Sequence, residues 1–317
     1  MSSDRLAAIA VPAFGGDSPV RSDFPFASSF LTANGAEMHY VECGQGDPIL
    51  LLHGNPASVY IWRNVIPLLS TKGRVVAVDL VGFGKSGKPD IEYRFKDHAA
   101  YLEAFIALQG LKNITLVMHD WGSGLGFDYA ARHPDNVHAL AFLEALLAPI
   151  PALERWPNQH VAEQFRRYRT PGVGWDLIVN QNDFVEKRLQ EGIIRRLSDE
   201  ELHYYREPFK EPKSRKPVWR WPNELPIDGT PHDVAEVQAR YVKWLVRTNK
   251  PKMLLFASPG ALTPDSVVRW ARTTLSNLET IDLGPGIHNL QEDHPLEIGH
   301  AIATWLDRVN QAQGVHL

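Results

Sequence analysis

The sequence predicts an α/β fold in which helices cover both faces of a mostly parallel sheet and an inserted helical cap interrupts the core. Between about Phe30 and Ala148, short apolar runs rich in β-branched residues alternate with helical patterns. The strand-like runs are apolar throughout, which indicates strands buried on both faces, as in a parallel sheet with helical crossovers. This alternation stops after Pro149 and returns after Lys250, which predicts an insertion between two parts of one core.

The period of the apolar residues predicts each element in turn. Continuous or alternating apolar runs indicate strands, and apolar residues that recur every three or four positions indicate helices. The expected elements are strands at 37–42 and 48–52, a helix at 61–69, a strand at 75–79, a helix at 97–108, a strand at 114–118, a helix at 122–132, strands at 137–143, 252–257 and 279–283, and a helix at 296–309.

The interrupting segment has a different composition. Residues 149–241 are rich in proline, tryptophan and charged residues, as in the run Trp219-Arg220-Trp221-Pro222, and they contain a helical run at 184–197 but no strand pattern. We therefore expect a core domain formed by residues 26–148 and 242–317 and a helical cap domain formed by residues 149–241.

The overall composition excludes several classes of protein. The 317 residues include 33 basic and 37 acidic side chains, a net charge of −4, with no basic block of the kind that binds nucleic acid or an anionic membrane. The single cysteine, Cys43, excludes an intramolecular disulfide and a cysteine-rich metal site. No run approaches the ~20 apolar residues of a membrane span, and the N-terminus lacks a signal-peptide pattern. We expect a cytoplasmic monomer or small homo-oligomer without a nucleic-acid or membrane partner.

The strongest local motif is the run LVMHDWGSG at residues 116–124, where an apolar strand leads directly into a helix rich in small residues. It has the form of a nucleophile elbow, with Asp120 at the position of the serine in G-x-S-x-G. The N-terminus of the following helix favours an anion, so Asp120 is expected to stay ionised and to attack carbon. Met118 replaces the usual first glycine, so the packing of this turn is expected to differ.

Two further motifs follow predicted strands. The run His53-Gly54-Asn55-Pro56 comes directly after strand 48–52, where a turn places a backbone N–H beside the elbow as an oxyanion donor. His288 follows the last strand and precedes the C-terminal helix. Its position after the last strand makes it the candidate general base.

Together these motifs resemble the α/β-hydrolase fold and, within it, the haloalkane dehalogenases. The resemblance extends from about residue 30 to residue 309, and it implies an eight-stranded, mostly parallel sheet. Residues 1–25 have no counterpart in it and are expected to form a loose N-terminal extension. The residues that carry the resemblance are HGNP at 53–56, DLVGFGKS at 79–86, HDWG at 119–122, Glu144, PGALT at 259–263 and His288.

The resemblance assigns a role to each of these site residues. It implies that Asp120 is the nucleophile, that His288 is the base and that Trp121 and Asn55 hold the departing halide. One branch of the family carries its catalytic Asp after the strand corresponding to 252–257, where this sequence has Thr263. We therefore expect Glu144, at the end of the preceding strand, to be the catalytic acid. Asp265 is the reserve candidate.

The reaction that the resemblance implies is hydrolysis of a haloalkane to an alcohol, a halide ion and a proton through a covalent alkyl-aspartate ester. Water is the only cosubstrate, and no cofactor or metal is expected. The partners are thus a small halogenated organic substrate, water and the halide product. By position in the resemblance, a dry pocket is expected to be lined by Phe165, Phe184, Pro222 and Leu262, with Ile193 nearer the tunnel mouth.

Three other functions remain open from the sequence. An epoxide hydrolase of the same fold would use cap tyrosines, for which Tyr168, Tyr204 and Tyr205 are available, although such enzymes usually carry an aromatic residue in place of Asn55. An oxygenase of the coelenterazine-luciferase type resembles this branch and shares the Asp, Glu and His. A catalytically silent ligand-binding module is disfavoured by the intact set of nucleophile, acid, base and halide donors.

Overall fold

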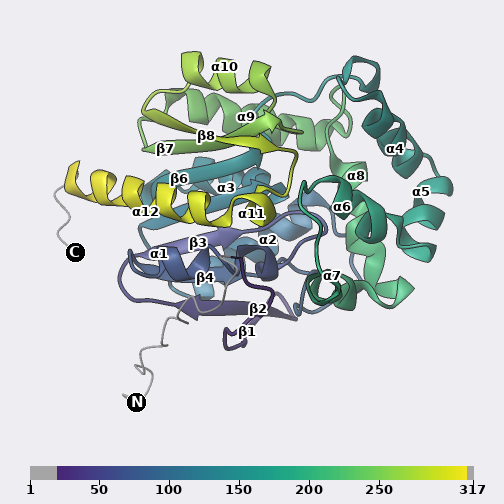
Figure 1. Ribbon diagram of the computed structural model, residues 1–317, viewed down its shortest axis with the longest axis horizontal. Coiled ribbons are helices and arrows are strands. Elements are labelled where there is room, and N and C mark those ends of the chain that lie inside the picture. Colours follow the sequence, from purple (N-terminus) through teal and green to yellow (C-terminus); the bar gives the residue numbers. More distant parts are fainter. Residues whose placement is uncertain (1–19, 313–317) are drawn as a thin grey trace.

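One sheet of eight strands runs through the molecule in the order β1-β2-β4-β3-β5-β6-β7-β8, in a computed structural model that describes residues 20–312 (Figure 1). β2 is antiparallel to both of its neighbours, and the other six strands, β3 to β8, are parallel to one another. The predicted sheet is therefore confirmed. The strands are β1 (Ser29–Ala33), β2 (Ala36–Cys43), β3 (Pro48–Leu52), β4 (Arg74–Val78), β5 (Ile114–Asp120), β6 (Val137–Ala145), β7 (Lys252–Pro259) and β8 (Leu278–Gly286).

The side chains of the central strands contribute to two buried clusters, one on each face of the sheet. Leu50 and Leu52 of β3 belong to one cluster, whereas Ile49 and Leu51 belong to the other. Successive side chains of a strand point to opposite faces, so a strand that is apolar throughout fills both clusters. Every residue of β3, β5 and β6 is buried, which explains why these strands are mostly apolar in sequence.

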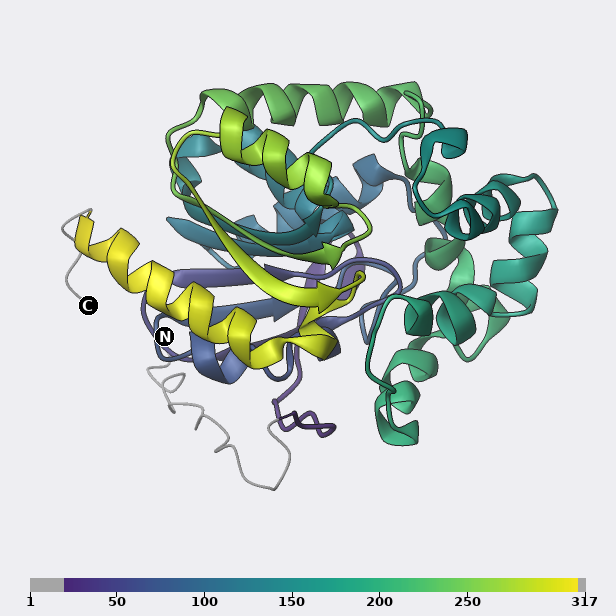
Figure 2. The same ribbon diagram turned by 45° about the horizontal axis from the view of Figure 1, so that its top comes forward.

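Helices cover both faces of the sheet (Figure 2). On one face α1 contacts α12, which also contacts β7 and β8, and on the other face α3 contacts α2 and α9. The helices of the core are α1 (Ile66–Leu69), α2 (Phe95–Leu108), α3 (Trp121–Arg132), α9 (His232–Arg247), α10 (Asp265–Thr274), α11 (Leu290–Asp293) and α12 (Pro295–Ala312).

A helical cap lies at one end of the sheet, beside the carboxyl ends of the parallel strands (Figures 1 and 2). It includes two π-helical turns, Asp176–Asn180 and Phe184–Arg188. The helix expected at 184–197 therefore begins as a π-helical turn, and it ends at Gly192. The α-helices of the cap are α4 (Gln159–Arg169), α5 (Val173–Trp175), α6 (Leu189–Glu191), α7 (Asp199–Arg206) and α8 (Lys216–Glu224).

The boundary between cap and core differs from the expected one. Helix α9 packs on α3, and the Tyr241 hydroxyl donates a hydrogen bond to the carbonyl oxygen of Leu146 at 2.8 Å. The expected boundary after residue 241 thus falls inside α9, which packs on α3. Periodicity alone did not separate α9 from the cap helices, because both follow the same helical pattern.

The first strand and the first helix also differ from the expectation. Strand β1 was not predicted, because it is a half-exposed edge strand with few fully buried residues. The helix expected at 61–69 is divided into a 3₁₀ turn, Val59–Trp62, and α1, which has Pro67 in its first turn.

Residues 1–19 of the expected N-terminal extension lie outside the described residues. Between residues 20 and 312, no helix has both the length and the apolar character needed to cross a bilayer.

Candidate active site

Asp120 is the last residue of β5, and α3 begins at the next residue. Its backbone has φ 48° and ψ −126°, a positive φ that is unfavourable for a residue with a Cβ atom. A strained turn from a strand into a helix is the geometry of a nucleophile elbow. Oδ2 of the carboxylate accepts a hydrogen bond from the backbone N–H of Asn55 at 2.9 Å. The elbow and the turn after β3 therefore meet at this carboxylate.

Two glycines allow the chain to come this close around Asp120. A Cβ atom on Gly54 would lie 2.2 Å from Oδ2 of Asp120, so the turn after β3 reaches the carboxylate only without a side chain. A Cβ atom on Gly126 would lie 2.3 Å from Sδ of Met118. Met118 is thus accommodated at a position where a small residue is usual, because α3 has a glycine opposite its thioether.

Burial raises the pKa of the Asp120 carboxyl, since the ionised form loses its hydration. The positive charge that His288 can carry and the backbone N–H groups of Asn55 and Trp121 act in the opposite direction. The side chain faces a cavity, yet the residue is only 6% exposed. A poorly hydrated carboxylate is a better nucleophile than a fully hydrated one.

His288 lies between two carboxylates. Nδ1 of its ring is 3.1 Å from Oε2 of Glu144, and Nε2 is 4.0 Å from Oδ2 of Asp120. The ring is therefore hydrogen-bonded to Glu144 and faces Asp120 without a direct bond. This arrangement leaves Nε2 free to take a proton from a water molecule near Asp120.

Glu144 lies near the end of β6, is fully buried and has φ 43°. The loop after β7 surrounds its carboxylate with donors: the backbone N–H groups of Ala261 and Leu262 at 2.9 and 2.7 Å, and the hydroxyl of Thr263 at 2.7 Å. A buried carboxylate stays ionised only where such partners replace water. Thr263, which stands near the position expected for an acid in the other branch, thus donates to the carboxylate of Glu144.

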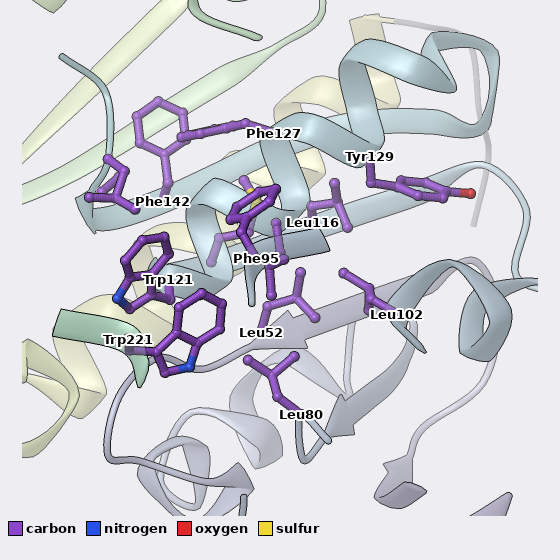
Figure 3. Close-up of a cluster of buried hydrophobic side chains, with 14 of the residues drawn as sticks. Leu52, Leu80, Phe95, Leu102, Leu116, Trp121, Phe127, Tyr129, Phe142 and Trp221 are labelled. Carbon is purple, nitrogen blue, oxygen red and sulfur yellow. The ribbon is translucent and has the colours of Figure 1, made fainter. Parts of the chain in front are cut away.

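The two expected halide donors lie next to the carboxylate. The indole of Trp121 stacks on that of Trp221 from α8, with ring centroids 4.2 Å apart (Figure 3). The side-chain amide of Asn55 donates to the carbonyl oxygen of Val218 at 3.2 Å. An amide NH₂ carries two hydrogens, so this contact leaves one N–H for a ligand.

A cavity of about 1380 Å³ lies between the core and the cap. Asn55, Asp120, Trp121 and His288 all line it. Four of the five expected pocket residues also line it, and these are Phe165, Phe184, Pro222 and Leu262. The fifth, Ile193, is not among the lining residues, because its side chain is buried in the same apolar cluster as Leu189 and Leu197.

Comparisons with known proteins agree with this geometry. A family model described as alpha/beta hydrolase fold matches residues 47–295. A haloalkane dehalogenase of Mesorhizobium japonicum is 46% identical over 296 residues, which cover 92% of this chain and 92% of that protein. The crystal structure of the haloalkane dehalogenase DbeA from Bradyrhizobium elkani is 42% identical with a TM-score of 0.89, and the match covers 90% of this chain and 99% of that one. The chain belongs to the haloalkane dehalogenase family.

A second solved structure supports the same assignment. The haloalkane dehalogenase DatA from Agrobacterium tumefaciens is 37% identical, with a TM-score of 0.85, and the match covers 89% of this chain and 97% of that one. Relatives of this similarity that span nearly the whole chain place both the core and the cap in the haloalkane dehalogenase family.

In this member of the haloalkane dehalogenase family, a cluster of three buried charged residues and the partly exposed Arg195 includes Glu292, which follows His288 by four positions. We call Arg63, Arg195, Glu201 and Glu292 the anchor cluster. Both arginines bind both glutamates, with Arg63 at 2.7 Å from Glu292 and 2.8 Å from Glu201. No pattern in the sequence indicates this cluster, because Arg63 and Glu292 are 229 positions apart and belong to no common motif.

Backbone hydrogen bonds join the same loop to the cap. The carbonyl oxygen of Gly192 accepts bonds from the backbone N–H groups of His288 at 3.0 Å and Asn289 at 2.8 Å. The carboxylate of Asp293 accepts bonds from the N–H groups of Ile194 at 3.1 Å and of the next residue at 3.0 Å. The loop that carries the candidate base is therefore fixed to cap residues 192–195.

The three cap tyrosines considered for epoxide opening do not line the cavity. The hydroxyl of Tyr168 donates to Asp183 at 2.7 Å, and that of Tyr205 donates to Glu292. Tyr204 stacks on the ring of another tyrosine, with centroids 4.1 Å apart. These contacts give each tyrosine a structural role.

The remaining expected site residue, Asp265, is the exposed first residue of α10. It lines the outer part of the cavity, whereas the Nδ1 atom of His288 is bonded to Glu144. Within residues 20–312, no group of three or more His, Cys, Asp or Glu side chains is arranged to hold a metal ion.

Proposed function

We propose that this chain hydrolyses haloalkanes to an alcohol, a halide ion and a proton through an ester of the Asp120 carboxylate. The observation that carries the proposal is the position of His288 between Glu144 and Asp120, with Asp120, His288 and two neutral N–H donors lining one cavity. Asp120 Oδ2 or Oδ1 attacks the halogenated carbon, an ester C–O bond forms, and the carbon–halogen bond breaks with its electron pair leaving on the halide.

Neutral donors suit the halide in this step. The indole N–H of Trp121 and the remaining amide N–H of Asn55 stabilise the charge that develops on the halogen. Neither group is a cation, so the halide can dissociate after the displacement. The largely apolar lining of the cavity strengthens both hydrogen bonds, because it limits the polar groups that compete with them.

The second step regenerates the nucleophile. His288 Nε2 takes a proton from water, and the hydroxide attacks the carboxyl carbon of the ester. The backbone N–H of Asn55, 2.9 Å from Oδ2 of Asp120, and that of Trp121 are placed to stabilise the oxyanion. Glu144 stabilises the histidinium through Nδ1. Collapse of this intermediate releases the alcohol, and the imidazolium then loses its proton to solvent.

The first experiment measures halide release from 1-bromobutane and 1,2-dibromoethane by the wild type and Asp120→Ala. We expect release by the wild type and none above background by the variant. Asp265→Asn is the matched control, since it removes an exposed carboxylate of the same cavity, and it should retain release. Release by Asp120→Ala at the wild-type rate, or opening of styrene oxide without any halide release, would contradict the proposal.

A second experiment tests the ester. Without its base, His288→Ala should complete the displacement but not the hydrolysis, so the protein should gain the mass of one alkyl group after incubation with 1-bromobutane. Intact-mass spectrometry reports this gain, and Asp120→Ala treated in the same way should show none. An unchanged mass in a folded His288→Ala protein that still releases a single equivalent of halide would reject the ester.

A further inference from the structure

The charged side chains around the cavity are mostly cationic. Besides Asp120, the cavity is lined by one other acidic residue, Asp265, and by three arginines, Arg155, Arg188 and Arg269. Arg155, Arg269 and Asp265 are exposed. Arg188 is different, because its side chain is only 10% exposed. A cation this deeply buried in a pocket for neutral haloalkanes requires an explanation.

The local backbone turns Arg188 inward. It is the last residue of the π-helical turn Phe184–Arg188, and it lines the cavity together with Phe184 and Leu189. Its neighbour Lys187 points the other way, with a side chain that is 68% exposed and paired with Asp183 at 2.5 Å. Two adjacent cations of one turn thus occupy opposite environments.

The guanidinium of Arg188 has few hydrogen-bond partners among the described residues. Its only ion pair with a described residue is between Nη1 and Oε2 of Glu191 at 3.4 Å, and the same carboxylate accepts closer bonds from the amide of Gln164 at 2.9 and 3.1 Å. By contrast, Arg63 makes three carboxylate bonds of 2.7–2.8 Å. A guanidinium has five N–H donors in a rigid fork, so most of those of Arg188 are left for another acceptor.

The other acidic groups of the turn are engaged elsewhere. Asp183 binds the Tyr168 hydroxyl and Lys187, and Glu186 binds Arg206 at 2.7 Å. None of these carboxylates lines the cavity. Among the described residues, no further carboxylate of this turn is thus left for Arg188, and its remaining donors are open to an acceptor inside the cavity.

We propose that Arg188 binds the carboxylate of a halogenated carboxylic acid whose halogenated carbon lies at Asp120. This inference rests on the proposed dehalogenation. A carboxylate matches the guanidinium fork with two parallel hydrogen bonds, which are strong in a site with little water. The cavity wall also includes the apolar side chains of Phe184 and Leu189, which suit an alkyl chain.

The charge of Asp120 sets a requirement on chain length. A substrate carboxylate close to the nucleophile would meet a like charge in a dry site, which is strongly unfavourable. Acids with the halogen on the carbon next to the carboxylate are therefore excluded, and acids with the halogen at the far end of a longer chain are accepted. The substrate class is that of medium-chain carboxylic acids halogenated at the end remote from the carboxylate.

The test compares charged and neutral substrates of equal chain length. We would measure kcat/KM for 6-bromohexanoate and 8-bromooctanoate, and for 1-bromohexane and 1-bromooctane, in the wild type, Arg188→Gln and Lys187→Gln. Each variant loses one positive charge from the same turn, but only one loses it from the cavity. We expect the ratio of charged to neutral kcat/KM to fall about tenfold or more in Arg188→Gln, mainly through KM. Lys187→Gln should keep the wild-type ratio.

Several outcomes would overturn the inference without touching the proposed function. These are an equal ratio in the wild type and Arg188→Gln, an equal fall in Lys187→Gln, and hydrolysis of 1-bromohexane without any hydrolysis of the bromoalkanoates. Arg188→Lys should recover part of the ratio, which a purely structural role of the arginine would not predict. Failure of the wild type on all four substrates would instead reject the dehalogenation itself.

Discussion

The catalytic group, which is Asp120, Glu144 and His288, and the anchor cluster meet at the segment 288–293, and they differ in how their charges are balanced. In the anchor cluster two arginines face two glutamates, so each charge has opposite charges beside it. In the catalytic group Asp120 and Glu144 share a single histidine. One group thus has as many arginines as carboxyl groups, whereas the other has two carboxyl groups and one histidine.

This difference appears in the pKa values. Burial raises the pKa of the Asp120 carboxyl. Burial acts in the same direction on Glu201 and Glu292, but the arginines outweigh it and lower both pKa values, that of Glu201 to about 2. A carboxyl with a raised pKa reduces the stability of the fold while it is ionised, and one with a lowered pKa increases it. The folded state thus disfavours the ionised form of Asp120, the proposed nucleophile, and favours the ionised forms of Glu201 and Glu292.

The largest effect is expected when the catalytic group loses its nucleophile. Asp120→Asn removes the charge and keeps the shape, so halide release should fall by roughly 10⁴ or more. Stability should rise by about 1–2 kcal/mol, because a poorly solvated anion is gone. Halide release and chemical denaturation measure the two effects. A variant that is both inactive and less stable than the wild type would show that Asp120 is not strained by burial.

The anchor cluster should respond in the opposite way to loss of a charge. Arg63→Met leaves buried carboxylates without their partner, so the free energy of unfolding should fall by about 3–5 kcal/mol. The control is Arg308→Met, whose ion pair with Glu279 is half-exposed and should contribute no more than about 1 kcal/mol. Urea denaturation measures both. Equal losses in the two variants would remove the distinction between the anchor cluster and a surface pair.

The pH dependence of stability separates the two groups further. The gain in stability from Asp120→Asn should shrink as the pH falls through the raised pKa of Asp120, since a protonated Asp resembles Asn.

The melting temperature of Glu201→Gln should lie below that of the wild type at neutral pH. This deficit should shrink as the pH falls from the ordinary value of 4.5 towards 2, where the wild-type carboxylate becomes protonated. Differences that stay constant with pH would contradict both assignments.

The smallest effect is expected at the edge of the catalytic group. Thr263→Val removes one of the donors to Glu144 and leaves the backbone N–H groups in place, so it should destabilise the protein by about 1 kcal/mol. Halide release should fall only severalfold, because His288 keeps its partner. The control is Thr273→Val, whose exposed hydroxyl bonds only to carbonyl oxygens of its own helix. A loss of activity as large as that of Asp120→Asn would mean that Thr263 does more than support the acid.

The sequence predicted the residues that follow strand ends. Asp120, Glu144 and His288 each stand after an apolar run, and parallel strands bring such positions to one edge of the sheet. The structure brings Asp120 and His288 to one cavity and bonds the buried Glu144 to the His288 ring. Local pattern was sufficient here because the position of each residue follows from the strand that precedes it.

The same reasoning did not reach features that depend on distant partners. Arg63 and Glu292 have the appearance of surface residues, and only the tertiary fold brings them together. The inward direction of Arg188 depends on a π-helical turn, because this turn changes which residues share a face, and the pattern predicted an ordinary helix there. Ile193 was expected at the tunnel mouth but is covered by apolar neighbours, which periodicity does not reveal.

The hydrogen bonds between Gly192 and the His288 loop bear on how the two domains can be recombined. A chimaera that takes the cap from one dehalogenase and the core from another would have to match these backbone contacts as well as the anchor cluster. A mismatch would displace the base even with every catalytic residue present. The segment 189–195 and the loop 288–293 are therefore best taken together from the same parent protein, although they belong to different domains.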